Sequence, residues 1–224
     1  MIAKLVRRTV ISVLVMGLLL FGAAGTADWP SAWIFLVSQL LISLAGGVWL
    51  ARKDPELLAE RLKPLFQPGQ QSWDRLVLVA LITLGLSWFV VMGLDVRFGW
   101  SSVPVSVQIL GASLLVPMAV LSYLTFRENR YAAPVVRVQT ERGHRVISSG
   151  PYAYVRHPMY AGVIFFGLGV PLMLGALSGL IVSGLTLVVV GIRAVLEERL
   201  LAAELPGYAD YAERVRYRLV PLVW

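Results

Sequence analysis

The chain has 224 residues and a net charge of +7; 58% of the residues are hydrophobic, only 15% are charged, and the mean hydropathy is +0.74. This composition excludes an ordinary soluble domain and is typical of an integral membrane protein. The chain has no cysteine, and neither His144 nor His157 has a neighbour at metal-ligand spacing, so we expect no disulfide, thiolate nucleophile or metal centre.

Uncharged runs occupy residues 9–27, 29–51, 76–94, 98–126 and 158–192, and each is long enough to cross a bilayer as a helix. The last run has 35 residues, which is roughly 52 Å of helix against a hydrocarbon core of about 30 Å. The cluster 175–179 (Gly-Ala-Leu-Ser-Gly) in its middle therefore predicts a hairpin of two short helices. We predict one all-α, polytopic membrane domain over residues 1–224, with about six transmembrane helices divided between an N-terminal part, 1–126, and a C-terminal part, 127–224.

The first run also resembles a secretory signal, because it has a basic start and small residues at 25–27 before Asp28. Its apolar stretch is rather long for a signal. We therefore interpret it as an uncleaved anchor.

With six crossings, nearly all lysines and arginines fall on one face of the membrane, and only Arg97 falls on the other. The positive-inside rule predicts that the basic face and both termini are cytoplasmic, in what we expect to be a prokaryotic cytoplasmic membrane. The net charge of +7 is then chiefly a signal of topology, with some attraction to anionic lipid, and does not indicate nucleic-acid binding.

Three segments on the basic face are expected to lie at the interface. Asp54, Pro55 and Glu56 predict a helix start, followed by leucines that we expect to face the headgroup boundary. The polar loop after the fourth crossing could cover a cofactor. The tail, 197–224, predicts a second amphipathic helix placed to close over the segment 150–162.

The segment 150–162 (GPYAYVRHPMYAG) enters the hairpin from the basic loop. Pro158 suits the first turn of a helix, which leaves His157 near the cap. The free amides of that turn, together with Arg156, predict an electropositive pocket for a carboxylate or phosphate. We expect Tyr160 to offer a face to an aromatic ring and Gly162 to give room for close approach.

A second polar cluster, Arg193 with Glu197 and Glu198, follows the hairpin. Arg193 and Glu197 are four residues apart and can pair on one helical face, while Glu198 points about 100° away. One glutamate could thus be structural and the other free to hold ribose hydroxyls, an amine or a sulfonium.

Together these residues resemble a known family. The pattern Gly-Pro-Tyr, Arg-His-Pro-x-Tyr-x-Gly, an apolar hairpin, Arg-x-x-x-Glu-Glu and a tail with Tyr208, Tyr211 and Pro221 is similar to the isoprenylcysteine carboxyl methyltransferase and phospholipid methyltransferase superfamily. The resemblance covers roughly the C-terminal half of the chain.

The resemblance implies an integral-membrane enzyme that transfers a methyl group from S-adenosylmethionine to a lipophilic acceptor entering from the bilayer. It implies a cofactor site lined by the residues at the matching positions, which are His157, Pro158, Tyr160, Gly162, Glu197 and Glu198. Arg156 and Arg193 would orient groups or bind the acceptor, so that the catalytic set is Arg156, His157, Arg193 and Glu198.

Two alternatives remain open from the sequence. Membrane reductases that use NADPH to reduce sterols or fatty chains have a similar pattern with Asn before the Tyr and an acidic residue after the Gly, where this chain has Met159 and Val163. A non-enzymatic membrane protein, such as a small transporter, would need polar residues deep in the membrane, and the crossings offer few. An amine, a carboxylate or a thiol could each be the acceptor.

Overall fold

The computed structural model describes residues 1–224 and contains helices but no strands. The long helices are α1 (Ile2–Ala24), α2 (Pro30–Lys53), α4 (Ser72–Phe98), α5 (Val105–Ser113), α6 (Leu115–Glu128), α7 (Pro158–Leu174) and α8 (Gly179–Glu204). Two short helices, α3 (Pro55–Arg61) and α9 (Tyr208–Arg214), and two 3₁₀ turns, η1 (Thr140–Arg142) and η2 (Gly150–Ala153), complete the fold.

Five helical segments are long and apolar enough to cross a membrane: α1, α2, α4, the pair α5 and α6 taken together, and α8. The sixth predicted crossing corresponds to α7, an apolar helix of only 17 residues, about 26 Å long. The prediction of an all-α, polytopic membrane fold is confirmed. One boundary differs, since residue 98 ends α4 and the fourth crossing begins at Val105 after Pro104.

The predicted hairpin is present. Helix α7 ends at Leu174, and Gly175 follows it with φ of 74°, a left-handed conformation that glycine adopts without strain. Helix α8 begins at Gly179. Asp95 at the end of α4 holds this turn, because its Oδ2 accepts hydrogen bonds from the Ser178 amide at 2.9 Å and the Ser101 hydroxyl at 2.8 Å.

Close helix packing surrounds the hairpin. A Cβ on Gly111 of α5 would lie 2.4 Å from the Met173 amide nitrogen of α7, so the two backbones can approach this closely only at glycine. Trp88 of α4 donates a hydrogen bond from its indole to the Gly179 carbonyl at 2.8 Å. The hairpin is therefore fixed between α4 and α5.

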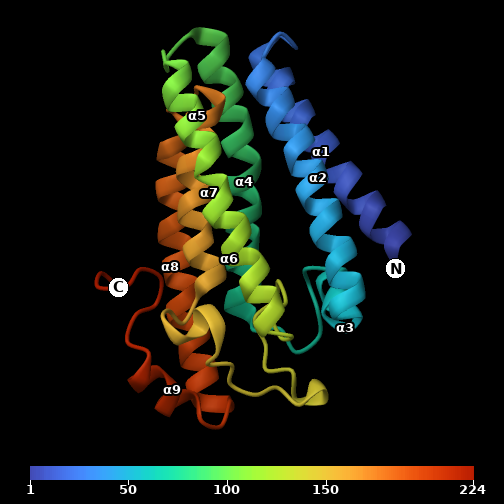
Figure 1. Cartoon of the computed structure of the whole chain (residues 1–224), viewed down its shortest axis with the longest axis vertical. Coiled ribbons are helices and arrows are strands. Elements are labelled where there is room, and N and C mark those ends of the chain that lie inside the picture. The colour runs from blue at the N-terminus through green and yellow to red at the C-terminus, as the bar shows by residue number, and fades with distance from the viewer.

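The polar segments gather at one end of the helix bundle, where α3, α9, the loop 129–157 and the tail lie together (Figure 1). Asp54 caps α3 by accepting from the Leu57 amide at 2.9 Å, as expected. The expectation for its leucines is wrong, because Leu57 and Leu58 are buried against Leu5 and Leu50 rather than facing lipid. This end of the bundle holds the candidate site.

Candidate active site

The segment 150–162 starts the site, and the tail pairs with its backbone. After η2 the chain reaches His157, which is the N-cap of α7, and Pro158 is the first helical residue, as predicted. The amides of Arg156 and His157 donate to the carbonyls of Tyr217 and Arg218, both at 2.9 Å. The tail therefore fixes the two residues directly before α7.

Glu198 is the centre of a partly buried ionic network. Arg156 donates from Nε to Glu198 Oε1 at 2.6 Å and from Nη2 to Oε2 at 3.1 Å, and Arg218 Nε donates to Oε2 at 2.9 Å. His157 Nε2 lies 3.2 Å from Oε1. A carboxylate held by two guanidinium groups can only accept, so His157 Nε2 is the donor in this contact.

Glu197, the neighbouring carboxylate, has fewer partners. Its Oε2 accepts from the Tyr160 hydroxyl at 2.7 Å and lies 4.0 Å from His157 Nδ1, whereas Oε1 has no hydrogen-bond partner. The rings of His157 and Tyr160 are stacked, with centroids 5.2 Å apart and an interplanar angle of 6°. The freer glutamate is thus Glu197, and Glu198 is the structural one.

The predicted pairing of Arg193 with Glu197 is not found. Arg193 donates to Asp74 Oδ1 from Nε at 3.0 Å and from Nη2 at 2.8 Å, and also to the Pro134 carbonyl at 2.7 Å. Asp74 is fully buried and was not identified from the sequence. Its Oδ2 accepts from the Val136 amide at 3.1 Å, so the pair holds both ends of the loop segment 134–136.

A cavity of about 100 Å³ lies beside these groups. Among the predicted site residues, Arg156, His157, Pro158, Tyr160 and Glu197 line it, and Arg193, Glu198 and Gly162 do not. A Cβ on Gly162 would instead face α6, 3.8 Å from the Met118 carbonyl oxygen. The expected room beside Gly162 therefore lies at a helix contact and not in the cavity.

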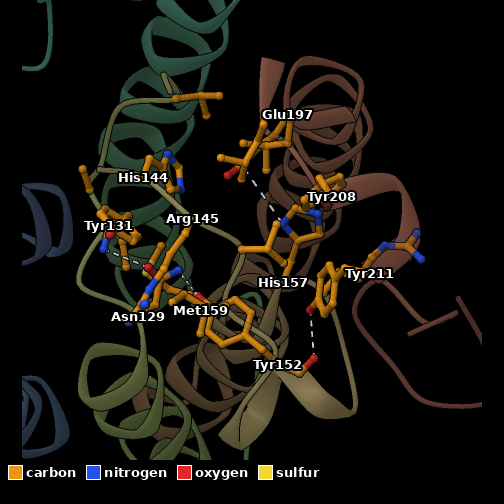
Figure 2. A pocket seen from close by; sticks show the side chains of 18 of the residues that line it. Asn129, Tyr131, His144, Arg145, Tyr152, His157, Met159, Glu197, Tyr208 and Tyr211 are labelled. Carbon is orange, nitrogen blue, oxygen red and sulfur yellow. Dashed lines mark hydrogen bonds and ion pairs between the residues drawn. The ribbon is translucent and has the colours of Figure 1, made fainter. Parts of the chain in front are cut away.

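The cavity has two walls (Figure 2). Glu197, His157, Tyr208 and Tyr211 lie on one side, and residues of the loop, Asn129, Tyr131, His144 and Arg145, lie on the other. Tyr208 and Tyr211 come from α9, which closes over the segment 150–162 as the tail was expected to do. The walls are otherwise largely apolar.

Hydrogen bonds of Tyr211 in the tail and Tyr152 in η2 also connect the two walls. Tyr211 donates to the Tyr152 carbonyl at 2.8 Å, and Asn129 donates from Nδ2 to the Tyr152 hydroxyl at 2.8 Å. Burial raises the pKa of Tyr152, Tyr208 and Tyr211, so all three stay protonated near neutral pH. They offer neutral aromatic surfaces to a ligand.

His144, on the loop wall, also stays neutral. Burial, and then the charges of Arg142 and Arg137, lower its pKa from 6.5 to about 4. Its Nδ1 accepts a hydrogen bond from the Gln139 amide at 3.3 Å, which places its proton on Nε2. Its ring lies against that of Tyr131, with centroids 4.4 Å apart.

Comparison with known families supports the resemblance. Residues 106–205 match the family model described as phospholipid methyltransferase. This family is part of the isoprenylcysteine and phospholipid methyltransferase superfamily, which the segment 150–162 and the two glutamates resemble. No curated protein matches the chain. The match begins in α5, contains the segment 150–162 and both glutamates, and ends directly after α8.

The match to this family supports a membrane methyltransferase in general. It favours this activity over the reductase and over a protein without enzymatic activity. Tyr208 and Tyr211 of the cavity wall lie beyond the matched residues, as do Asp74 and α1 to α4. The two tyrosines could be identified from the sequence, because both belong to the pattern that carries the resemblance. Asp74 could not, because the sequence shows it only as an acidic residue before an apolar run.

Proposed function

We propose that the protein is an S-adenosylmethionine-dependent methyltransferase that binds its methyl donor in the cavity between α9, Glu197 and the loop 129–147 and methylates a lipophilic acceptor from the bilayer. The observation that carries the proposal is that Glu197, whose Oε1 has no hydrogen-bond partner, lines a cavity together with tyrosines. A carboxylate and aromatic faces together attract a compact cation such as a sulfonium.

The side chains present suit this donor in chemistry. Five tyrosines line the cavity: Tyr131, Tyr152, Tyr160, Tyr208 and Tyr211. Their faces can contact an adenine ring or a cationic sulfur, and Glu197 adds a negative charge. The donor would therefore be held by Glu197, His157 and Tyr160 from the hairpin and by the tyrosines of η2, the loop and α9.

The volume of about 100 Å³ is below the roughly 300–1,000 Å³ of typical ligand pockets, so binding requires one wall to move. The backbone amides of residues 145–149 donate no hydrogen bond to the protein. By contrast, Asp74 and Arg193 hold residues 134–136. We therefore expect residues 145–149 to be the part of the wall that moves when the donor binds.

When bound, the donor supplies a methyl group on a sulfonium that is already activated for displacement. The protein then has to align the acceptor and exclude water. An acceptor amine must lose a proton as its nitrogen–carbon bond forms, and Glu197 Oε1 and His157 Nδ1 are the two nearby atoms able to take it. Glu198 keeps the His157 ring in this orientation.

Neither of the two arginines expected to bind a carboxylate acceptor is free to do so, and Arg145 is the cation in the cavity lining that remains for one. A carboxylate would need a free cation, but Arg156 donates to Glu198 and, from Nη1, to three tail carbonyls, those of Ala212, Val215 and Arg216. Arg193 is held by Asp74 and does not line the cavity. Neither arginine is therefore placed to bind the acceptor.

Binding of S-adenosylmethionine to the detergent-solubilised protein tests the proposal directly. We expect Glu197→Gln to weaken binding at least about tenfold, because the free carboxylate oxygen is lost while the shape is kept. Glu204→Gln, at the exposed end of the same helix, is the matched control and should bind as the wild type does. Equal affinities in calorimetry for all three proteins would refute the site.

A further inference from the structure

A second cavity, of about 410 Å³, lies beside the first, between the end of α2 and the end of α6. Its lining is mostly charged, with four basic side chains and three carboxylates. A cavity of this size and polarity at the basic end of a helix bundle can hold a headgroup.

All three carboxylates of this cavity already have partners. Asp54 caps α3, and Glu56 pairs with Arg130 at 2.7 Å. Glu128 pairs with Arg127 at 2.9 Å. The two glutamates are thus neutralised by arginines, whereas Asp54 keeps its charge, so the four basic and three acidic side chains leave the cavity with a net charge of +1.

Two cations remain. Lys53, at the end of α2, and Arg145, in the loop, both line the cavity and form no hydrogen bond or ion pair with the protein. They come from segments 92 positions apart in the sequence and meet at one cavity. Two free cations facing one space favour a doubly coordinated anion, and a phosphate is the anion that Arg and Lys bind best.

The position of the cavity favours a lipid as the source of that phosphate. It lies directly below the part of α6 that exposes apolar side chains, among them Val120 and Tyr123, which are 48% and 46% exposed. Tyr123 packs on Trp49 of α2 with ring centroids 4.8 Å apart. Trp and Tyr mark the headgroup level of membranes, so acyl chains can lie along α6 while a headgroup reaches the cavity.

A ligand bound in the second cavity would also affect the first cavity, because the two cavities share lining residues. Arg145 and Ile147 line both. They belong to the segment 145–149, whose amides donate no hydrogen bonds. A phosphate bound by Arg145 would thus fix a wall that is otherwise held by few contacts.

We propose that the second cavity binds the phosphate of an anionic phospholipid headgroup through Lys53 and Arg145, and that this lipid orders the wall shared with the first cavity. The site is independent of the proposed methyl transfer. Its ligand is a lipid bound without reaction, and it requires neither donor nor acceptor to be correctly identified.

Thermal unfolding of the purified full chain in mixed micelles tests this proposal. Phosphatidylglycerol carries the phosphate but no amine, so it is not an amine acceptor, and phosphatidylcholine is the zwitterionic reference. We expect phosphatidylglycerol to raise Tm by about 2–4 °C over phosphatidylcholine. Lys53→Gln and Arg145→Gln should each lose most of that shift. For each variant the shift is measured against its own Tm in phosphatidylcholine.

Arg52→Gln is the matched control, because it removes the same charge at the same end of α2 but at a residue that does not line the cavity. It should keep the shift. An equal loss in all three variants would overturn the proposal in favour of diffuse surface attraction, as would the absence of any shift in the wild type. A shift of the same size with inorganic phosphate alone would overturn the lipid as the occupant.

Discussion

Asp74 and Arg193 show how a single buried ion pair can shape a binding cavity without lining it. Both side chains are almost completely buried, and their contacts join α4 and α8 to the loop at Pro134 and Val136. Val136 itself lines the first cavity. The pair therefore determines where one wall of the site lies.

Removal of one partner of this pair should be costly. We expect Arg193→Met to lower the free energy of unfolding by about 3–5 kcal/mol, because it leaves the Asp74 carboxylate buried without its countercharge. Arg199→Met, an exposed residue on the same helix, should change stability by no more than about 0.5 kcal/mol. Unfolding in detergent measures the free energy of unfolding of both variants. A similar loss of stability in the two variants would contradict the role given to Asp74.

At the scale of elements, the loop 129–149 is held unevenly. Gln139 is buried and donates from Nε2 to the Tyr131 carbonyl at 2.9 Å, and Tyr131 donates to the Gly143 carbonyl at 2.7 Å. Arg61 of α3 donates to the Ala132 carbonyl at 2.7 Å. The first half of the loop is thus attached to the bundle, and the second half is the part that can move.

This loop should be sensitive to mild acid through His144. Burial holds the pKa of His144 near 4, below its ordinary value of 6.5, so between these values the unfolded loop binds more protons than the folded loop. The contribution of His144 to stability is full above about pH 6.5 and is lost as the pH falls toward 4.

Hydrogen exchange of residues 131–147 at pH 7.0, 5.5 and 4.5 measures this effect. After correction for the intrinsic rate, protection should fall across that range in the wild type and much less in His144→Gln. Parallel curves for the two proteins would show that His144 does not control the loop.

At the scale of the whole molecule, six crossings bring both termini to the same half of the bundle, where the polar segments also gather (Figure 1). We propose that this end faces the cytoplasm, because nearly all lysines and arginines lie there. The first cavity would then open toward soluble cofactors, and the apolar faces of the helices toward lipid.

The orientation can be tested with single cysteines, because the chain has none of its own. Ser148→Cys, in the loop beside the site, and Ser102→Cys, between α4 and α5, are exposed positions at opposite ends of the bundle. A membrane-impermeant maleimide added to intact cells should label only Ser102→Cys. Labelling of only Ser148→Cys would reverse the topology.

The sequence predicts the large features of this fold because they depend on local properties. Apolar run lengths identify the crossings, the small residues 175–179 identify the turn, and Pro158 identifies the start of α7. The segment 150–162 and the two glutamates also meet as expected, since the hairpin returns the chain to the same end of the bundle.

The ion-pair and packing partners of individual side chains could not be predicted, because they depend on contacts between segments that are far apart in the sequence. Helical spacing favoured a pair between Arg193 and Glu197, but Asp74, which lies 119 positions away from Arg193, takes the guanidinium instead. Local spacing also gave no sign that the leucines of α3 pack on α1 and α2. A buried countercharge from another helix outweighs a neighbour on the same helix surface.

The attachment of the tail to Arg156 and His157 has a consequence for biosynthesis. A ribosome makes the hairpin before residues 212–218, whose carbonyls receive the hydrogen bonds of Arg156 and His157. A partly translated chain already inserted in the bilayer thus lacks the cover over its cavity. The cavity wall formed by Tyr208 and Tyr211 and the hydrogen bonds to Arg156 and His157 can form only after residues 208–218 have been synthesised.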